Sequence, residues 1–367
     1  MSTAILYHND LAKYDFGEGH PFGGDRFKEF FNFFEARSLP FKNQFNIITA
    51  QPANDEMLKL VHSEGYIKAI HSASKGIILP DIYNYVSADN LNPITGYVPS
   101  GAEEGAKIIV GIALLAGELV AEGKFKKAIG IGGGMHHSKP DYGEGFCFYN
   151  DVAICVINLK KKYNLRRIIV LDTDAHAGNG TAEIFYSDPE VLFIDIHQDP
   201  RTIYPGTGFI SEIGSGAATG FTVNLPLLPG AGNQAYQYVF DEVIFPLASE
   251  FKPDIIIRYG GSDPHYLDEL TNLGLTLKGF LMIGKQVNLI SREVTQGKSV
   301  DLLLSGYNLR VLPFAWTALI AGLLDLNIDL SGLKEESPPP EGYRLRETKD
   351  MVRQLKGHLK KFWRCLN

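Results

Sequence analysis

The stretch that decides the fold spans residues 166–180 and reads Arg166-Arg167-Ile168-Ile169-Val170-Leu171-Asp172-Thr173-Asp174-Ala175-His176-Ala177-Gly178-Asn179-Gly180. Its first half is short, apolar and rich in β-branched residues, which is typical of a buried strand in a parallel sheet. Where that strand ends, Asp172, Asp174 and His176 alternate and therefore point to one side of an extended chain. They can hold a cation there, or they can simply cap a helix or pair with a lysine. This stretch alone leaves both interpretations open.

Short apolar runs of the same kind recur along the chain. They cover residues 4–7, 45–49, 128–132, 168–172, 191–196, 221–224, 254–259 and 300–304. Helical patterns separate most of the later runs; residues 236–247, for example, carry apolar side chains at three-to-four spacing. Strands that alternate with helices form parallel sheets with helices on both faces. We therefore predict an α/β fold built around one central parallel sheet.

The chain is expected to form one large domain with a terminal extension. No Pro-, Gly- or Ser-rich linker interrupts the alternating pattern before the Ser-Pro-Pro-Pro sequence at residues 337–340. We predict a main domain over residues 1–335 and, over residues 336–367, an amphipathic helix packed on it. The apolar stripe expected on that helix consists of Leu345, Val352, Leu355, Leu359, Phe362 and Leu366.

Composition restricts the environment and the partners of the protein. A net charge of −7 and a hydrophobic content of 45% are ordinary for a globular protein and favour no direct binding to nucleic acid. Three scattered cysteines fit a reducing interior better than a disulfide framework. The longest apolar run, residues 108–117, falls short of the roughly 18–20 residues of a membrane span. Because the amino-terminal residues also lack the pattern of a signal peptide, we expect a cytoplasmic protein without membrane contact.

Four of the predicted strands end in polar or glycine-rich sequence. One is the stretch above; the others are followed by Gly133-Gly134-Met135-His136-His137, Gly260-Gly261-Ser262-Asp263 and Ser305-Gly306-Tyr307-Asn308. A parallel sheet brings these ends to one edge, where ligands bind. Each motif is weak alone, and no Lys-Ser/Thr pair follows the first glycine run as a phosphate-binding loop requires. Together they supply the parts of a metal-assisted hydrolase.

A set of motifs taken together resembles the histone deacetylase superfamily, which includes acetoin-utilisation proteins and acetylpolyamine amidohydrolases. The motifs are His136-His137, Gly145-Phe146-Cys147, residues 172–180, Tyr204-Pro205-Gly206-Thr207-Gly208, Asp263 and Gly306-Tyr307. The resemblance implies a single-domain arginase/deacetylase fold, with residues 1–335 as the catalytic domain. It also implies zinc-dependent hydrolysis of an N-acetyl amide. The substrate would be acetyl-lysine in a protein or peptide or, alternatively, an acetylpolyamine or another small acetylated amine.

The resemblance further implies roles for individual residues. It assigns Zn²⁺, with Fe²⁺ as the alternative metal, to Asp174, His176 and Asp263. The general base would be His137 with Asn179 behind it, and its electrostatic partner would be His136 with Asp172 behind it. The oxyanion donor would be Tyr307. A monovalent cation, K⁺, is expected near Asp172, Asp174, His176 and Asp195.

Other positions match the family's substrate tunnel. Phe146 and Tyr204 would form its aromatic walls, Leu270 would line its mouth, and the Gly145 carbonyl would accept the substrate amide proton. An arginine beneath the pocket would be Arg26.

Two departures and two alternatives accompany this interpretation. The rim carboxylate that grips a protein substrate has no secure counterpart, and Asp89 is the candidate. The tyrosine loop also has a shorter glycine run than in many members.

Gly178 stands where related dimanganese ureohydrolases carry a carboxylate for a second metal, which disfavours a binuclear site. A catalytically inactive scaffold that binds acetylated ligands is the alternative from another class. The sequence leaves the oligomeric state open.

Overall fold

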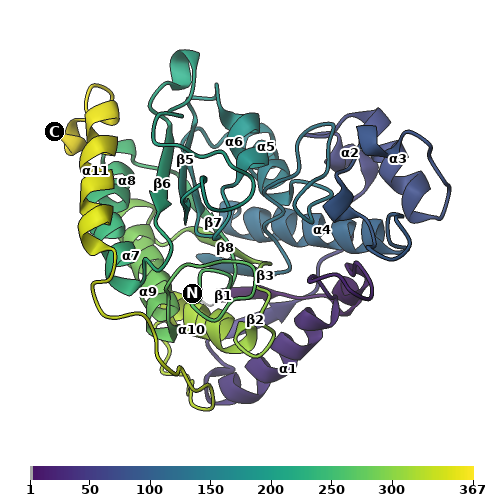
Figure 1. The fold of residues 1–367 in the computed structure, drawn as a ribbon, viewed down its shortest axis with the longest axis horizontal. Helices are drawn as coiled ribbons and strands as arrows, with labels where there is room; N and C mark the ends of the chain where they lie inside the picture. The colour runs from purple at the N-terminus through teal and green to yellow at the C-terminus, as the bar shows by residue number, and fades with distance from the viewer. Residues whose placement is uncertain (1–2) are drawn as a thin grey trace.

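One eight-stranded sheet forms the centre of the computed structural model, which describes residues 3–367 (Figure 1). Its strand order is β2-β1-β3-β8-β7-β4-β5-β6, and every neighbouring pair is parallel. The strands are β1 (Thr3–Leu6), β2 (Phe45–Ile48), β3 (Lys127–Ile131), β4 (Ile168–Asp172), β5 (Val191–Gln198), β6 (Thr222–Leu227), β7 (Ile255–Tyr259) and β8 (Ser299–Leu303). The predicted parallel sheet is therefore confirmed.

Each strand coincides with one of the apolar runs, and β4 has the predicted bounds. The largest differences are at the carboxyl ends of β5 and β6, which continue two and three residues past the predicted ends at residues 196 and 224. In β5 the added residues are His197 and Gln198, which are buried although they are polar. A hydrophobicity pattern ends where such residues begin, so it cannot follow the strand to its end.

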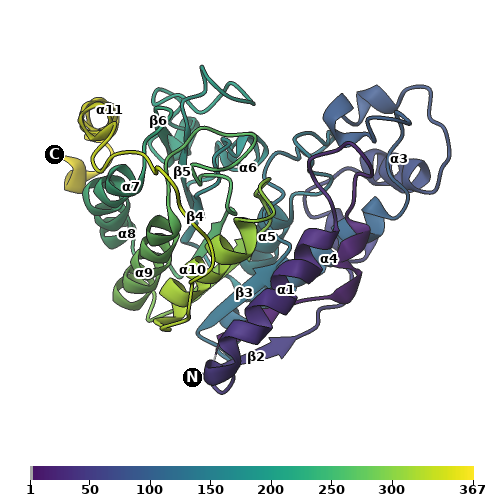
Figure 2. The same cartoon turned by 60° about the horizontal axis from the view of Figure 1, so that its bottom comes forward.

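Two layers of helices cover the sheet, one on each face (Figure 2). The first layer consists of α4 (Ala102–Ala121), α5 (Asp151–Tyr163) and α6 (Asn179–Phe185). The second consists of α1 (Asp25–Ser38), α7 (Asn233–Val239), α8 (Phe245–Phe251), α9 (Leu277–Val294) and α10 (Leu312–Leu324). Two further helices, α2 (Asp55–Leu58) and α3 (Glu64–Ser74), precede α4, and α3 packs against it. The expected helical cover on both faces is thus present.

Polar side chains set several helix boundaries. The Asn54 side chain accepts a hydrogen bond from the Met57 N–H at the start of α2, and the Asn150 side chain accepts one from the Ala153 N–H at the start of α5. The helix α2 has only four residues and ends at Leu58. The segment expected to be helical over residues 236–247 contains a π-helical turn, Phe240–Ile244, between α7 and α8.

The last helix, α11 (Leu345–Leu359), packs against α7 and β6. The predicted stripe is buried at Val352, Leu355, Leu359 and Leu366, but it is wrong at Phe362, which is 37% exposed. The helix has ended before that position, so helical spacing no longer applies. Trp363 is buried in its place and donates a 2.7 Å hydrogen bond from Nε1 to the Gly220 carbonyl.

The four strands with polar carboxyl ends are neighbours in the sheet. They are β3, β8, β7 and β4, adjacent in that order, so their four following loops meet at one edge. This is the arrangement that brings residues from distant parts of the chain into one site. Within the part of the chain that the structure describes, no helix combines the length and apolarity of a membrane span.

Candidate active site

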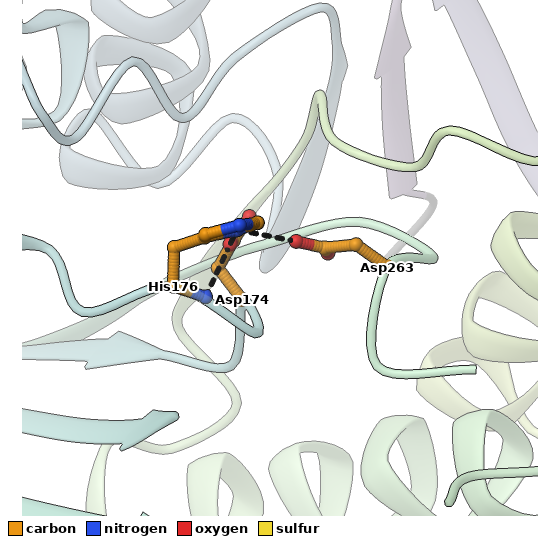
Figure 3. A group of neighbouring side chains, drawn as sticks. All are labelled: Asp174, His176 and Asp263. Carbon is orange, nitrogen blue, oxygen red and sulfur yellow. Dashed lines mark hydrogen bonds and ion pairs between the residues drawn. The ribbon is translucent and has the colours of Figure 1, made fainter. Parts of the chain in front are cut away.

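Two carboxylates converge on one imidazole at this edge of the sheet. Asp174 and His176 follow β4, and Asp263 follows β7 (Figure 3). The Nδ1 atom of His176 lies 3.1 Å from Oδ1 of Asp174 and 3.1 Å from Oδ2 of Asp263. One potential ligand atom from each residue lies within 4.8 Å of the others, and all three residues are buried. The sequence analysis predicted that these three residues lie together, and in the structure they form one cluster.

The charge balance of this cluster suits a divalent cation. Burial lowers the pKa of His176, but hydrogen bonds and charge from Asp174 and Asp263 outweigh it and raise the pKa to about 10. Among the described residues, no lysine or arginine forms an ion pair with either carboxylate. Two buried carboxylates without a lysine or arginine partner need positive charge beside them, either on the neighbouring imidazoles or from a bound ion. One imidazole and two carboxylates are also a common donor set for Zn²⁺ or Fe²⁺, so the residues fit such an ion.

Hydrogen bonds from neighbouring groups orient the two carboxylates. The Ser305 hydroxyl donates to Oδ1 of Asp263 at 2.6 Å, which leaves Oδ2 directed at His176. The His176 N–H donates to Oδ1 of Asp174 at 2.9 Å. Such contacts from outside a metal site fix the direction of its ligands.

A pair of histidines after β3 lies beside this cluster, and a different residue supports each ring. The Nδ1 atom of His136 lies 2.7 Å from Oδ2 of Asp172, and the Nδ1 atom of His137 lies 2.7 Å from Oδ1 of Asn179. The ring centroids of the two histidines are 4.0 Å apart. Both pairings match those that the family resemblance implied.

The different partners push the pKa values of the two histidines apart. Burial lowers the pKa of His136, but Asp172 and Asp174 more than compensate and raise it to about 9. Burial also lowers the pKa of His137, and the neighbouring His136 and His176 lower it further, well below the usual value. His137 is therefore unprotonated near neutral pH and offers a free nitrogen lone pair, while His136 carries positive charge. A pair of titratable groups separated in this way is typical of acid–base sites.

Tyr307 lines the same cavity, whose volume of about 10 Å³ leaves room for little more than one water molecule. Its backbone N–H donates to Oδ2 of Asp268 at 2.8 Å. Arg26, which is 1% exposed, donates from Nη1 to the Gly306 carbonyl at 2.8 Å and thereby supports the tyrosine loop from below. Burial raises the pKa of Tyr307 well above its usual value, so the phenol keeps its proton and can donate it in a hydrogen bond.

The residues expected to form the tunnel lie at different depths. Phe146 and Gly145 line the cavity, and the Phe146 ring packs edge to face with Tyr307 at 5.8 Å. Tyr204 lies farther out, 40% exposed, with its ring 5.0 Å from the His137 ring. Leu270 is also 40% exposed, and its N–H donates to Asp268, which holds it near the tyrosine loop.

The remaining candidates lie around this centre. Asp195 pairs with Asp172 across β4 and β5, and its Oδ2 accepts from the Gly178 N–H at 2.9 Å. Asp89, the candidate rim carboxylate, accepts hydrogen bonds from the Gly145 N–H at 3.0 Å and from the Ser87 hydroxyl. Both oxygens of Asp89 thus have partners within the chain.

Sequence reasoning missed several supporting residues. Asp268 and Ser305 support Tyr307 and Asp263, Glu144 contacts Asn179, and Asp151 accepts from the Met135 N–H before the two histidines. Their position next to a motif was a usable signal for Ser305 and Glu144. No local pattern indicates which loop the other two contact.

The fold and this site define a class of protein, an α/β protein with a buried acid–histidine centre at the carboxyl edge of a parallel sheet. A family model described as the histone deacetylase domain matches residues 20–323. The acetoin utilization protein AcuC of Staphylococcus xylosus is 36% identical over 325 residues, which cover 88% of this chain and 83% of that protein. A probable deacetylase of Archaeoglobus fulgidus is 34% identical over 382 residues, covering 100% of this chain and 99% of its own.

A solved structure agrees with these sequence matches. The crystal structure of the HDA15 HD domain superposes with a TM-score of 0.83 at 25% identity, covering 100% of this chain and 98% of that one. The chain therefore belongs to the histone deacetylase family, and its fold is the arginase/deacetylase fold. The family and the named relatives support a hydrolase of the deacetylase class that acts on acetylated substrates.

Proposed function

We propose that this protein is a zinc-dependent deacetylase that hydrolyses the N-acetyl amide of lysine side chains in a protein or peptide. The observation that carries the proposal is the convergence on one cavity of the Asp174, His176 and Asp263 cluster, two histidines of opposite pKa shift, and Tyr307. Zn²⁺, or Fe²⁺ in its place, would be held by the three cluster residues. A metal of this kind polarises the substrate carbonyl and lowers the pKa of a water molecule.

The protein residues would carry the proton transfers. His137 takes a proton from the attacking water as the water oxygen bonds to the acetyl carbon. It then gives that proton to the leaving nitrogen as the C–N bond breaks, which yields acetate and an amine. The Tyr307 hydroxyl donates a hydrogen bond to the oxyanion that develops on the acetyl oxygen. His136, held by Asp172, keeps a positive charge beside the reacting groups.

The substrate would enter between aromatic side chains. Phe146 and Tyr204 would flank the aliphatic part of the acylated side chain, with Leu270 at the mouth. The Gly145 carbonyl would accept the substrate amide proton. A K⁺ ion near Asp172, Asp174, His176 and Asp195 would stiffen the loop that carries the metal ligands.

A specific observation favours small acetylated amines as a second candidate. In Asp89, the candidate rim carboxylate, each oxygen already accepts a hydrogen bond from within the chain, which leaves fewer acceptor sites for the backbone of a protein substrate. The experiment is a turnover panel of acetyl-lysine peptides, acetylputrescine and acetylspermidine with the zinc-loaded protein. Preference for the peptides supports the proposal, and preference for the polyamines supports the second candidate. Tight binding without turnover of any substrate would indicate an inactive scaffold.

Two further expectations complete the proposal. Residues 1–335 would form the catalytic domain, and residues 336–367 would stabilise it from outside; the site residues all lie in the first segment, and α11 packs on its surface. A cytoplasmic location is supported by three free cysteines in the described chain.

A further inference from the structure

The hydrogen bond behind His137 comes from an amide, which has two chemically different ends. Oδ1 of Asn179 lies 2.7 Å from Nδ1 of His137, and Nδ2 of Asn179 donates to Oε1 of Glu144 at 2.8 Å. Rotation of the amide by half a turn would exchange its oxygen and its NH₂ group with little change in shape. The NH₂ group would then face Nδ1 of His137 and favour a proton on Nε2. In that tautomer Nε2 cannot accept a proton.

The carboxylate of Glu144 is itself held in place. Lys139 Nζ lies 3.2 Å from the same Oε1 atom, and the Tyr204 hydroxyl also hydrogen-bonds to this side chain. The Glu144 side chain is only 16% exposed. A carboxylate has no donor to offer, so the group of Asn179 that faces it must be the NH₂ group. Tyr204 also packs its ring against His137, so Glu144 contacts two of the side chains that contact that histidine.

We propose that Glu144 is a positioning residue for deacetylation: it holds the Asn179 amide in the orientation that places the amide oxygen against Nδ1 of His137. The proposal rests on the proposed function, in which Nε2 of His137 accepts the proton of the attacking water. Glu144 touches no reacting atom and acts through Asn179. Asn179 places an amide, and not a carboxylate, behind His137. Glu144 places a carboxylate behind that amide.

The competing explanation is a surface ion pair between Glu144 and Lys139. Pairs of this kind contribute little to stability, and their loss leaves activity unchanged. Glu183 offers a matched control, because its carboxylate lies 3.7 Å from the same Lys139 Nζ but has a 57% exposed side chain. Loss of Glu183 removes one negative charge beside the same lysine without touching Asn179.

The first experiment compares Glu144→Ala, Glu144→Gln and Glu183→Ala in zinc-loaded protein on an acetyl-lysine amide. Glu144→Ala is expected to lower kcat by about 10- to 100-fold, the usual effect of removing an outer support of a catalytic group, with a smaller change in KM. Glu144→Gln should keep most of kcat, since its amide oxygen can still accept from Asn179. Glu183→Ala should match the wild type. A Glu144→Ala enzyme with wild-type kcat, or equal losses in both Glu144 variants, would overturn the proposal.

The second experiment repeats Glu144→Ala in an Asn179→Asp background. A carboxylate presents an oxygen to His137 in either orientation, so it needs no partner to orient it. Removal of Glu144 should therefore cause no further loss of kcat there. The same fold-loss in both backgrounds would show that Glu144 acts by another route and would overturn the proposal.

A third measurement does not depend on turnover. The ¹⁵N chemical shifts of the His137 imidazole, assigned through their loss in His137→Gln, report which nitrogen carries the proton. Wild type should carry it on Nδ1, and Glu144→Ala should shift population toward Nε2. Unchanged shifts would contradict the positioning role. Absence of turnover by the wild type, in contrast, would refute the proposed function alone.

Discussion

The backbone N–H of Tyr307 donates a 2.8 Å hydrogen bond to Oδ2 of Asp268, whose Oδ1 accepts from the N–H of Leu270. One carboxylate thus joins the tyrosine loop to the loop at the mouth of the cavity. Because this contact uses the backbone, replacing the Tyr307 side chain leaves it intact. The effect of such a replacement therefore reports on the phenol hydroxyl.

Tyr307→Phe is predicted to lower kcat by about 10²- to 10³-fold, because it removes a donor aimed at the developing oxyanion. KM should change little, since this interaction strengthens only as charge builds on oxygen. The measurement is steady-state kinetics on an acetyl-lysine amide, with metal content and Tm as controls. A variant that retains most of its kcat would remove Tyr307 from the mechanism.

The two histidines are predicted to contribute unequally. His137→Ala should lose about 10²- to 10⁴-fold in kcat, the range typical of a general acid–base residue. His136→Ala should lose less kcat, because a histidine that stays protonated does not act as the base. Burial lowers the pKa of His136, but the charges of Asp172 and Asp174 outweigh burial and raise that pKa to about 9. Both variants are assayed at matched zinc content. Small and equal losses would argue that neither ring transfers a proton.

The purified protein is predicted to bind about one divalent metal per chain, held by Asp174, His176 and Asp263. Removal of the metal with a chelator should abolish activity, and added Zn²⁺ should restore it. Asp174→Ala and Asp263→Ala should lose binding. Ser305→Ala should weaken binding by about 10- to 100-fold, because its hydroxyl orients Asp263.

Elemental analysis and titration against a chelating dye measure these affinities. Glu183→Ala, an exposed carboxylate variant, serves as the control and should bind metal normally. Two metal ions per chain, or activity with none, would contradict the mononuclear site.

Stability is predicted to fall in mild acid because of His62. Burial lowers the pKa of His62 from 6.5 to about 4. Its Nε2 accepts from the Asn150 N–H at 2.9 Å, so a proton there would break that bond. Between pH 6.5 and 4 the unfolded chain binds this proton and the folded chain does not. Unfolding free energy should therefore decrease with falling pH, by at most about 1.4 kcal/mol per unit from this residue.

The test compares urea midpoints of wild type and His62→Gln from pH 7 to pH 4. Glutamine can still accept from Asn150 but does not titrate, so its stability should depend less on pH. An unchanged pH slope in this variant would rule out His62 as the cause.

Local pattern was enough to predict the sheet. A strand buried on both faces, such as β4, is mostly a short apolar run, and its length and β-branched residues distinguish it from a buried helix segment. Polar residues that follow β3, β4, β7 and β8 then indicate the edge that binds ligand, because carboxyl ends of parallel strands share an edge. Asp174, His176, Asp263 and the histidine pair could therefore be found without coordinates, although each motif alone was ambiguous.

The contacts that complete the site depend on how loops from distant parts of the chain pass one another. Glu144 reaches Asn179 and Asp268 reaches Tyr307 across 35 and 39 residues of sequence, and neither pairing leaves a repeat or a spacing to recognise. The same holds for Trp363, which is buried against Gly220 while Phe362 is exposed. The sequence alone thus indicated the sheet and its ligand-binding edge, because these follow from short apolar runs and the polar residues after them, and the family resemblance assigned roles to the reactive side chains. Only the tertiary structure decided which neighbours orient those side chains, because hydrogen bonds between loops depend on the path of the backbone in space.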